Sequence, residues 1–590
     1  MSDHGTSSDK FRFRYITTFD LEKLMSNMNG KSAPGTDGIS LKMLKSHFKH
    51  LKDVLVHIIN LSLTSGTFPD SLKIARVIPI FKSGDPLVLS NYRPISLLSS
   101  IAKLIERWIK HLLYDYLESR NLISENQYGF RRGIGVDEAL FHLTKDINSL
   151  LDRGQNGILL TLDLAKAFDS IDRDILINML PDYGFEGKEL EWVKSYFSNR
   201  RQVVSVLGVD STDSEIQYGV IQGGTLAALF FLIFVNRIDR LALKGKIYLF
   251  ADDTAILCEA DSWSKLFREA NSDMELVFQW LSRHKLSLNI QKTKYLVFSK
   301  SPSKKTLNDH GIKIHTCNNS PYSNCDCPSI ERASSIRYLG IHIDENLKWE
   351  KHILQAALKI RKYSHIFYRL RSCLSIEATI LIYKALVQSV IGFGMIAWGG
   401  ATSGVLNRLA ITQKAILKVM ARKPRRFPSN DLFQLIPVYS VQQLYLKSAL
   451  IFFHKHPNYF PYKRTNQYPI RLTSQTIIPA PLTRLWSTGR HIYNSLPYLL
   501  RSLPEDMLQP KNFTRSAFKK KIFTFLILKG HLACEELISS IYAVPIAVKI
   551  TFVLFSESDH KRTFIQFQYT STAHVHELRR SRTSVSISVE

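Results

Sequence analysis

The sequence predicts a protein of the α/β (α+β) class, because two kinds of hydrophobic pattern alternate along the chain. Short apolar runs such as GILLTLD, which ends at Asp163, are typical of buried strands. Longer segments with apolar residues at helical spacing, such as Ser100 to Glu118, predict amphipathic helices. The chain has 590 residues, more than one hydrophobic core usually supports, so we expect at least two packed units.

The first part of the chain is expected to be helical and then to enter a strand. Residues 16–60 predict a helix, a turn at KSAPGTDG and a second helix. The apolar residues that recur there at helical spacing are Leu21, Leu24, Met25 and Met28. Residues 74–81 are rich in β-branched side chains and predict a strand. The next stretch, LSNYRPISLL, predicts a loop that leads into the helix beginning at Ser100.

The middle of the chain predicts strands that meet acidic residues at their ends. Residues 202–209 and 216–222 predict a short strand pair. The segment from Thr225 to Ile238 is so apolar that its helix must be interior. Ile247 to Cys258, IYLFADDTAILC, predicts a hairpin with Ala-Asp-Asp-Thr at its tip. Adjacent carboxylates at such a tip repel each other, so we expect a cation beside them.

The last third of the chain predicts mainly helices, one of them with a basic face. The pattern SIRYLGIHID, from Ser334, predicts a strand. A long helix is expected next, with apolar positions at Ile353, Ala356, Ile360, Phe367 and Leu370. Its other face carries Lys359, Arg361, Lys362, Arg369 and Arg371. This face suits a phosphate backbone, and a solvated charged face is the equal alternative. Further helices are expected over residues 375–455.

The charge balance predicts a polyanionic partner. The chain carries 78 Lys and Arg against 51 Asp and Glu, which leaves a net charge of +27. Nucleic acid and an anionic membrane surface both fit that charge. The longest apolar stretches, such as Leu226 to Val235, are shorter than the roughly 20 residues of a membrane span. The first residues, MSDHGTSSDK, lack the apolar core of a secretory signal, so we expect an intracellular location, in nucleus and cytoplasm.

Cysteine usage also favours a reducing compartment. Six cysteines in so long a chain are too sparse for a disulfide framework. Cys317, Cys325 and Cys327 cluster in HTCNNSPYSNCDC, but the segment has no CxxC pair and is rich in Asn, Ser and Pro. We therefore expect a surface loop there, with a zinc site as the alternative.

Three aspartates are the strongest chemical signal in the sequence. Asp163 ends one apolar strand, and Asp252 and Asp253 lie at the tip of a hairpin. If the strands are neighbours in one antiparallel sheet, the carboxylates converge and can hold the two Mg²⁺ ions that nucleotidyl transfer uses. Taken singly, an Asp-Asp pair is often a solvated turn, and Asp163 could cap the next helix. A two-metal site and these plainer interpretations stay open on the residues.

The order of several motifs resembles a known family. TLDLAKAFDSID is similar to the first palm motif of reverse transcriptases, and YLFADDTAIL resembles their Y/F-A-D-D motif. WLSRHKLSLNIQKTKYLVFSK and SIRYLGIHIDENLKW are similar to two downstream motifs. Upstream, NGKSAPGTDGIS, the segment LKIARVIPIFKSGDPLVLSNYRPISLLSS and SENQYGFRRGIGVDEAL resemble the fingers motifs of non-LTR retrotransposon polymerases, the jockey-like LINE class. The resemblance spans residues 16–455 in the expected order.

The resemblance implies roles for individual residues. Asp163, Asp252 and Asp253 would be the catalytic carboxylates, and with the carbonyl of Leu164 they would bind the metal ions. Cations of the fingers, Arg76, Lys82 and Arg93, would bind the triphosphate. Arginine suits this task because its planar guanidinium can hold two phosphate oxygens at once.

Further roles fall around the incoming nucleotide. Phe168 would stand against the 2′ position of the sugar and exclude a hydroxyl, with a core aromatic as the alternative. Gln222 and Gly223 would lie against the nucleotide and the template base. Lys292, in the signature NIQKT, would protonate the departing pyrophosphate, with a plain surface lysine as the alternative.

The fold that the resemblance implies is a right-hand polymerase with fingers, palm and thumb, followed by a mainly helical C-terminal region. Residues 1–59 would lead into the fingers, and 60–343 would form the fingers and palm of the reverse transcriptase domain. Residues 344–455 would form the thumb and a helical post-polymerase region. Residues 456–590 would be a basic C-terminal region, poorly ordered or unrelated toward its end.

The implied activity is that of an RNA-directed DNA polymerase, which adds deoxynucleotides to a primer 3′ end on an RNA template. Its partners would be the RNA template, a DNA primer or target and deoxynucleoside triphosphates. The alternative is a truncated, catalytically impaired product that only binds nucleic acid. A basic membrane-surface or ribonucleoprotein scaffold is a third possibility, which the order of the motifs disfavours.

The sequence departs from the family pattern in three places. Where a Pro-Gln-Gly-Ser run continuing to Leu-Gly-Pro is usual, this chain reads IQGGTLAA from Ile221 to Ala228. The loss of Pro and Ser puts the rigidity of this loop, and hence the catalytic rate, in question. The chain also begins near the fingers, so we assign it no endonuclease activity. Residues from about 540 onward resemble nothing in the family. The cluster Arg422 to Arg426 suits nuclear import and RNA binding equally.

Overall fold

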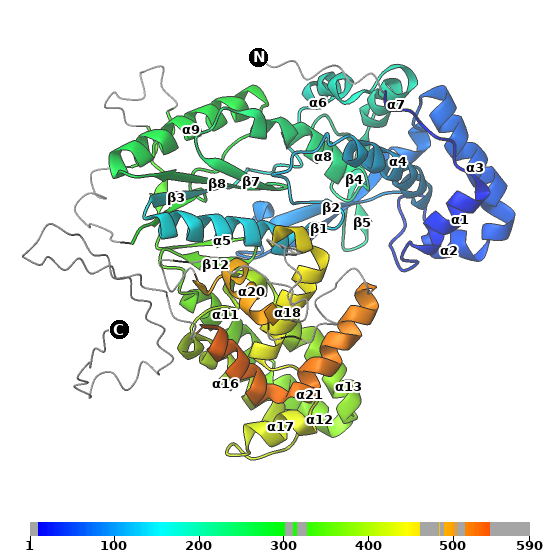
Figure 1. The fold of residues 1–590 in the computed structure, drawn as a ribbon. Helices are drawn as coiled ribbons and strands as arrows, with labels where there is room; N and C mark the ends of the chain where they lie inside the picture. Colours follow the sequence, from blue (N-terminus) through cyan, green and yellow to red (C-terminus); the bar gives the residue numbers. More distant parts are fainter. Residues whose placement is uncertain are drawn as a thin grey trace, which may run out of the picture. The chain divides into compact units, whose positions relative to one another are not determined.

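The computed structural model describes residues 10–300, 311–315, 327–460, 483, 489–501, 503 and 514–542 (Figure 1). The chain forms two compact units. Unit 1 comprises Met1–Ala139 and Gln155–Gly340, and unit 2 comprises Leu140–Gly154 and Ile341–Glu590. Within the described ranges, every helix is too short or too polar to cross a membrane. Cys317 and Cys325 lie outside the described residues, and Cys327 is partly buried.

The central sheet of unit 1 has five strands in the order β10-β9-β3-β8-β7. The strands are β3 (Asn156–Leu162), β7 (Lys246–Phe250), β8 (Asp253–Ala260), β9 (Lys294–Phe298) and β10 (Glu331–Arg332). Strand β3 pairs antiparallel with both β8 and β9, so its apolar side chains are buried. Helix α9 (Trp263–Arg283) packs along β3 and β8 (Figure 1). The predicted hairpin and the predicted buried strand are both confirmed.

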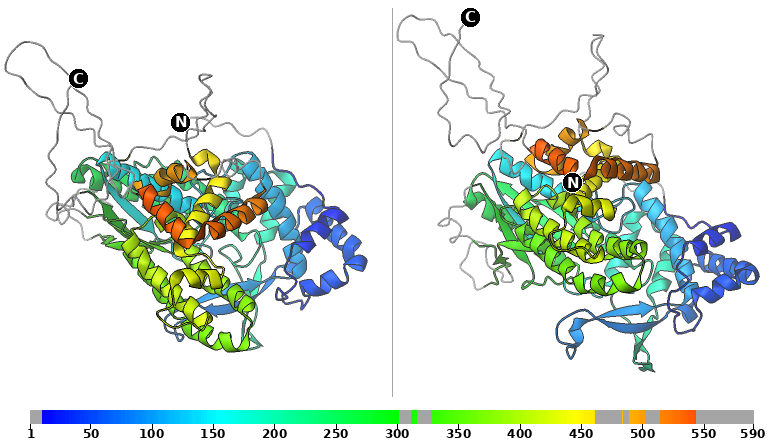
Figure 2. Two further views of the ribbon diagram at one scale, coloured as in Figure 1. Left: turned by 60° about the horizontal axis from the view of Figure 1, so that its bottom comes forward. Right: turned by 90° about the horizontal axis from the view of Figure 1, so that it is seen from below.

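A second sheet of unit 1 has the order β2-β1-β4-β5, with β6 also paired to β4. Its strands are β1 (Ile74–Phe81), β2 (Tyr92–Leu97), β4 (Arg201–Val206), β5 (Val209–Asp210) and β6 (Ser214–Glu215). Strand β1 pairs antiparallel with β2 and parallel with β4. The outer part of the β1–β2 hairpin extends away from the rest of unit 1 (Figure 2), and its Leu87 and Leu89 are almost fully exposed.

Two predictions in this region were wrong. The segment LSNYRPISLL is not all loop, because Tyr92–Leu97 forms β2 through pairing with β1. Pro94 made this segment resemble a loop in the sequence. The proline is accommodated in the strand because β2 is an edge strand and Pro94 lies directly opposite Pro79 of β1. Residues 216–222 are not a strand. The partners of β4 are instead the short strands β5 and β6.

Helices cover the sheets of unit 1. They are α1 (Thr18–Ser26), α2 (Leu41–Ser46), α3 (Phe48–Ser65), α4 (Ser100–Ser119), α6 (Arg173–Met179), α7 (Gly187–Phe197) and α8 (Ala227–Val235). Helix α8 is almost entirely buried, as its apolar sequence predicts, and a short 3-10 helix extends it to Arg240. The predicted helix over residues 100–118 is confirmed, while residues 16–60 contain three helices instead of two.

Unit 2 is mainly helical in its described part, which also contains the strand β12 (Ile341–Asp344). Its main helices are α5 (Val136–Arg153, which begins in unit 1), α11 (Glu350–Arg361), α12 (Ser364–Cys373), α13 (Ile376–Tyr383), α16 (Ser403–Met420), α17 (Ser429–Leu435), α18 (Val441–Lys455), α20 (Ile492–Arg501) and α21 (Arg515–Tyr542). The expected single helix through residues 353–370 is wrong, because it divides into α11 and α12. At the break, the N–H of Tyr363 donates to the carbonyl of Ile360, three residues back, which interrupts the α-helical ladder.

Candidate active site

The strand register brings the predicted aspartates to one edge of the central sheet. Leu162 ends β3 and pairs with Thr254 of β8. Asp163 follows Leu162, and Asp253 precedes Thr254, so the same antiparallel register sets these two residues opposite each other. Asp252 lies at the tip of the β7–β8 hairpin, where Phe250 pairs with Asp253. The three carboxylates therefore gather where β3 ends and β8 begins.

The electrostatics of this edge favour a bound cation. The pKa of Asp253 is raised to about 6, first by desolvation and then by the negative charges of Asp252 and Asp163. A divalent ion relieves such repulsion, and carboxylate oxygens are ligands that Mg²⁺ prefers. Across the described residues, no three His, Cys, Asp or Glu side chains are already spaced to hold a metal ion.

Lys292 lies beside Asp163 in a turn that is tied to the end of β3. Its Nζ is 3.9 Å from Asp163 Oδ2, and about two thirds of its side chain is exposed. The N–H of Asn289 donates to the carbonyl of Asp163 at 2.8 Å, and Thr293 Oγ1 accepts from the N–H of Asp163 at 3.3 Å. Leu164 forms a single β-bridge with Leu288 in the same turn. The turn thus fixes the backbone around Asp163 and leaves most of the Lys292 side chain exposed.

Phe168 is half-buried between aromatic neighbours. Its ring stacks on Phe231 of α8, with centroids 4.5 Å apart, and meets the edge of Phe130 at 6.2 Å. The carbonyl of Phe168 accepts the N–H of Val220 at 2.9 Å. Phe168 is therefore packed on one side and keeps part of its ring accessible, which agrees with a contact to a substrate and with a core aromatic alike.

The altered loop from Ile221 to Ala228 is anchored at its backbone. The carbonyl of Gln222 accepts the N–H of Ser96 at 2.8 Å. Gly223 has φ +124°, and a Cβ there would lie 2.4 Å from the carbonyl oxygen of Ser96. Among the described residues, Gln222 Oε1 is one of the buried side-chain atoms without a hydrogen-bond partner. The loop lies tightly against β2, and only glycine fits at position 223.

A buried carboxylate holds the other end of this loop. Glu106 of α4 is fully buried and accepts the N–H of Thr225, while the Tyr196 hydroxyl donates to its Oε1 at 2.8 Å. Burial raises the pKa of Glu106, and the guanidinium of Arg200 opposes that rise. Arg200 lies 4.2 Å above the Tyr196 ring. These contacts restrain the loop although its sequence lacks the proline and serine usual in the resembling family.

The three predicted triphosphate-binding cations lie on or just beyond the β1–β2 hairpin. Arg93 of β2 is exposed and pairs with Ile80 of β1. Arg76 and Ile80 are separated by four residues along β1, so Arg76 and Arg93 emerge from the same face. Arg76 Nη2 is 3.2 Å from Asp210 Oδ2, so this cation already has an acidic partner. Lys82 follows β1, and its N–H donates to the carbonyl of Asn91.

The segment from Asn126 to Phe130 belongs to the site, although its residues carried no individual prediction. Gln127 Oε1 accepts the N–H of Ala251, the residue before Asp252, at 3.1 Å. A Cβ on Gly129 would lie 2.5 Å from the same nitrogen. Their signal in the sequence was the motif SENQYGFRRG. That motif indicated the family but not the contact with Ala251, because close contacts between backbone segments produce no periodic pattern in the sequence.

Comparisons with known proteins agree with this geometry. Residues 80–343 match the family described as reverse transcriptase (RNA-dependent DNA polymerase). A curated relative from Drosophila melanogaster, named "Probable RNA-directed DNA polymerase from transposon BS", is 26% identical over 72% of this chain and 47% of its own length. The RNA-directed DNA polymerase from mobile element jockey of Drosophila funebris is 25% identical over 71% of this chain and 45% of its own. The chain spans about half the length of these relatives.

Proposed function

Residues 80–343 belong to the reverse transcriptase family, in the form found in non-LTR retrotransposons, and from this premise we propose that the protein is an RNA-directed DNA polymerase. It adds deoxynucleotides to the 3′ end of a DNA primer or target on an RNA template. The observation that carries the proposal is the strand register that sets Asp163 opposite Asp253 within the matched residues. Primer extension by the full chain on a primed RNA template tests it.

In this proposal, Asp163, Asp252 and Asp253, with the carbonyl of Leu164, hold two Mg²⁺ ions. The mutual repulsion that raises the pKa of Asp253 supports a cation at this edge. Bound ions would stabilise charge on the attacking and leaving oxygens of the transfer. We propose that Lys292, whose Nζ lies 3.9 Å from Asp163 Oδ2, donates a proton to the departing pyrophosphate.

The incoming nucleotide is proposed to lie against both the β1–β2 hairpin and the loop at Gln222 and Gly223. Arg76, Lys82 and Arg93 bind its triphosphate, and Arg76 exchanges Asp210 for phosphate oxygens. The free acceptor of Gln222 faces the nucleotide or the template base. In a right-hand arrangement, residues 60–343 supply the fingers and palm, and residues 344–455 supply the thumb. We propose that the protein acts in the nucleus and the cytoplasm.

We expect Phe168→Ala to weaken discrimination between the two sugars. A ring against the 2′ carbon leaves no room for a hydroxyl, and alanine opens that room without removing a carboxylate. The ratio of ribonucleotide to deoxynucleotide incorporation efficiency should rise by about tenfold or more. The measurement is kcat/KM for both sugars at one templated position.

Phe231→Leu is the matched control for this prediction. Phe231 is fully buried and stacks on Phe168, so its loss loosens the same packing without opening the sugar side. It should lower overall activity and leave the ratio nearly unchanged. A fixed ratio in Phe168→Ala would show that Phe168 is only a core aromatic.

Unit 2 carries a long basic segment and is proposed to hold nucleic acid. Between Lys351 and Asn430 the sequence has fourteen Lys and Arg residues and one acidic residue, Glu377. Three of these basic residues are exposed: Arg361 at the end of α11, Lys362 directly after it, and Arg369 in α12. The ends of α12 and α16 are joined, because Arg422 Nη2 donates to the carbonyl of Arg371 at 2.6 Å. The cluster from Arg422 to Arg426 thus lies beside the basic end of α12.

Binding to RNA should weaken steeply with salt, because neutralised phosphates release condensed counterions. Lys362→Glu should make the slope of log affinity against log salt shallower by about one. Lys49→Glu, an exposed lysine of α3, is the control with the same charge change. Fluorescence anisotropy of labelled RNA measures both. An RNA affinity that does not depend on salt would contradict the electrostatic argument. Equal slopes for Lys362→Glu and Lys49→Glu would show that α11 and α12 do not contact the RNA.

A further inference from the structure

We propose that Gln127 is a positioning residue for the aspartate hairpin, and that the ion pair between Arg131 and Glu118 holds Gln127 in place. The inference deepens the proposed polymerase function, on which it rests, because the hairpin carries Asp252 and Asp253. It assigns a task to the motif SENQYGFRRG that the proposed chemistry leaves without one.

Gln127 restrains the backbone at the hairpin tip. Its Oε1 accepts the N–H of Ala251 at 3.1 Å and the N–H of Gly129 at 2.8 Å, and the residue is 1% exposed. Ala251 immediately precedes Asp252 and has φ +57°. A non-glycine residue in this left-handed conformation is strained, so it persists only where its surroundings hold it. The amide oxygen of Gln127 is such a restraint on Ala251.

The backbone around Gln127 also lies directly along the hairpin. The N–H of Tyr128 donates to the carbonyl of Leu249 at 2.8 Å, and the N–H of Leu249 donates to the carbonyl of Asn126 at 2.9 Å. Strand β7 is the last strand of the central sheet, so this segment pairs with the edge that β8 leaves free. Gly129 allows the close approach, because a Cβ there would meet the backbone nitrogen of Ala251.

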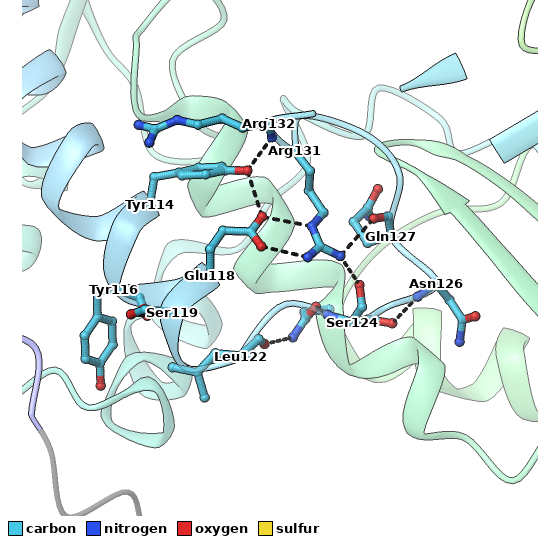
Figure 3. Close-up of polar contacts among 11 residues, drawn as sticks. Tyr114, Tyr116, Glu118, Ser119, Leu122, Ser124, Asn126, Gln127, Arg131 and Arg132 are labelled. Carbon is cyan, nitrogen blue, oxygen red and sulfur yellow. Dashed lines mark hydrogen bonds and ion pairs between the residues drawn. The ribbon is translucent and has the colours of Figure 1, made fainter. Parts of the chain in front are cut away.

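Arg131 fixes the segment to helix α4 (Figure 3). Its Nε and Nη2 donate to the two carboxylate oxygens of Glu118 at 2.9 and 2.7 Å. Its Nη1 donates to the carbonyls of Ser124 and, more weakly, Gln127, at 2.9 and 3.4 Å. Only about an eighth of the Arg131 side chain is exposed, so this two-pronged pair is shielded from water. The Arg131 guanidinium thus stabilises the turn that positions Gln127 beside the hairpin.

The neighbouring residue provides an internal comparison. Arg132 also pairs with an acid of α4, through Nη1 and Asp115 Oδ1 at 2.6 Å, but its side chain is 61% exposed. The guanidinium lies 4.4 Å above the Tyr114 ring, and the structure records no bond from it to the carbonyls of Ser124 or Gln127. A general loss of stability would speed exchange throughout unit 1, and the exposed Arg132 pair should contribute little to that stability. If the turn matters, only Arg131 should affect the hairpin.

The experiment combines amide hydrogen exchange with steady-state kinetics on the full chain. Gln127→Met keeps the side-chain length and removes the acceptor, whereas Gln127→Glu retains an acceptor oxygen. In Gln127→Met we expect the amides of residues 249–254 to exchange about tenfold faster and kcat to fall about tenfold. The KM for deoxynucleotides and the affinity for RNA should stay within about twofold, because the triphosphate and phosphate contacts remain. Gln127→Glu should recover most of both losses.

Arg131→Lys and Arg132→Lys form the matched pair for the clamp. Both keep a positive charge, but lysine cannot reproduce the two-pronged contact. We expect faster exchange at residues 249–254 in Arg131→Lys only. This pair also decides the proposal if Gln127→Met does not fold.

Unchanged exchange at residues 249–254 in Gln127→Met would overturn the role of Gln127. Equal exchange in the two arginine variants would overturn the role of the clamp. A wild-type chain that does not extend a primer would instead count against the polymerase function, and exchange would still decide whether Gln127 positions the hairpin. The two failures are therefore distinguishable.

Discussion

Asp252→Asn is expected to abolish primer extension while RNA binding stays within about twofold of the wild-type affinity. The substitution removes one of the two neighbouring negative charges that act on Asp253, and a neutral amide is a far poorer ligand for Mg²⁺. Asparagine has nearly the same volume, so packing should be unaffected. RNA binding depends on basic residues elsewhere and should persist. Extension of a labelled primer and anisotropy of labelled RNA measure the two properties.

Asp261→Asn is the matched control, because Asp261 directly follows the other end of β8 and is exposed. It should leave extension near the wild-type rate. Equal loss of RNA binding and extension in Asp252→Asn would indicate a folding defect. Extension that survives in Asp252→Asn would contradict the two-metal assignment.

The strands that carry the aspartates were predictable because each is a short, continuous run of apolar residues. An apolar run without polar alternation fits only a strand covered on both faces, which is where β3 lies. Two such runs on either side of an acidic tip predicted the β7–β8 hairpin. Their adjacency was a hypothesis, since pairing between β3 and β8 joins residues about a hundred positions apart.

Other elements depend on contacts that periodicity does not record. Strand β2 exists because β1 offers it a partner, and its own composition, with Pro94 at its centre, reads as a loop. The division between α11 and α12 occurs without a glycine or proline at Lys362 and Tyr363. Gln127 acts through a bond to a backbone nitrogen, for which the sequence contains no signal beyond the motif itself. Here tertiary packing overrides local preference.

The loop from Ile221 to Ala228 shows how structure changes an expectation about rigidity. Its sequence lacks the proline that would stiffen it, which placed its catalytic competence in question. In the structure, Ser96 holds its beginning and Glu106 holds its end. A loop that is proposed to contact the nucleotide can thus be restrained by hydrogen bonds to α4 and β2 instead of by its own covalent stiffness.

Gly223→Ala is therefore expected to raise the KM for deoxynucleotides on the order of a hundredfold. The residue has φ +124°, a conformation that costs an L side chain roughly 1–3 kcal/mol, and the new Cβ would lie 2.4 Å from the carbonyl oxygen of Ser96. Because that oxygen belongs to the backbone of β2, it cannot rotate away as a side chain would. The loop must move off β2, and Gln222 moves with it. Each 1.4 kcal/mol lost from nucleotide binding is about a tenfold change.

Gly208→Ala separates the effect of the clash from that of the backbone conformation. Gly208, between β4 and β5, also has a positive φ of +84°, but nothing lies within 4 Å of a Cβ there. Both variants should lose some thermal stability, and only Gly223→Ala should raise the nucleotide KM, measured by primer extension over a range of deoxynucleotide concentrations. RNA affinity should be the same in both, because neither change touches a basic residue. A normal KM in a folded Gly223→Ala variant would show that this loop does not contact the nucleotide and that the assignment of Gln222 and Gly223 is wrong.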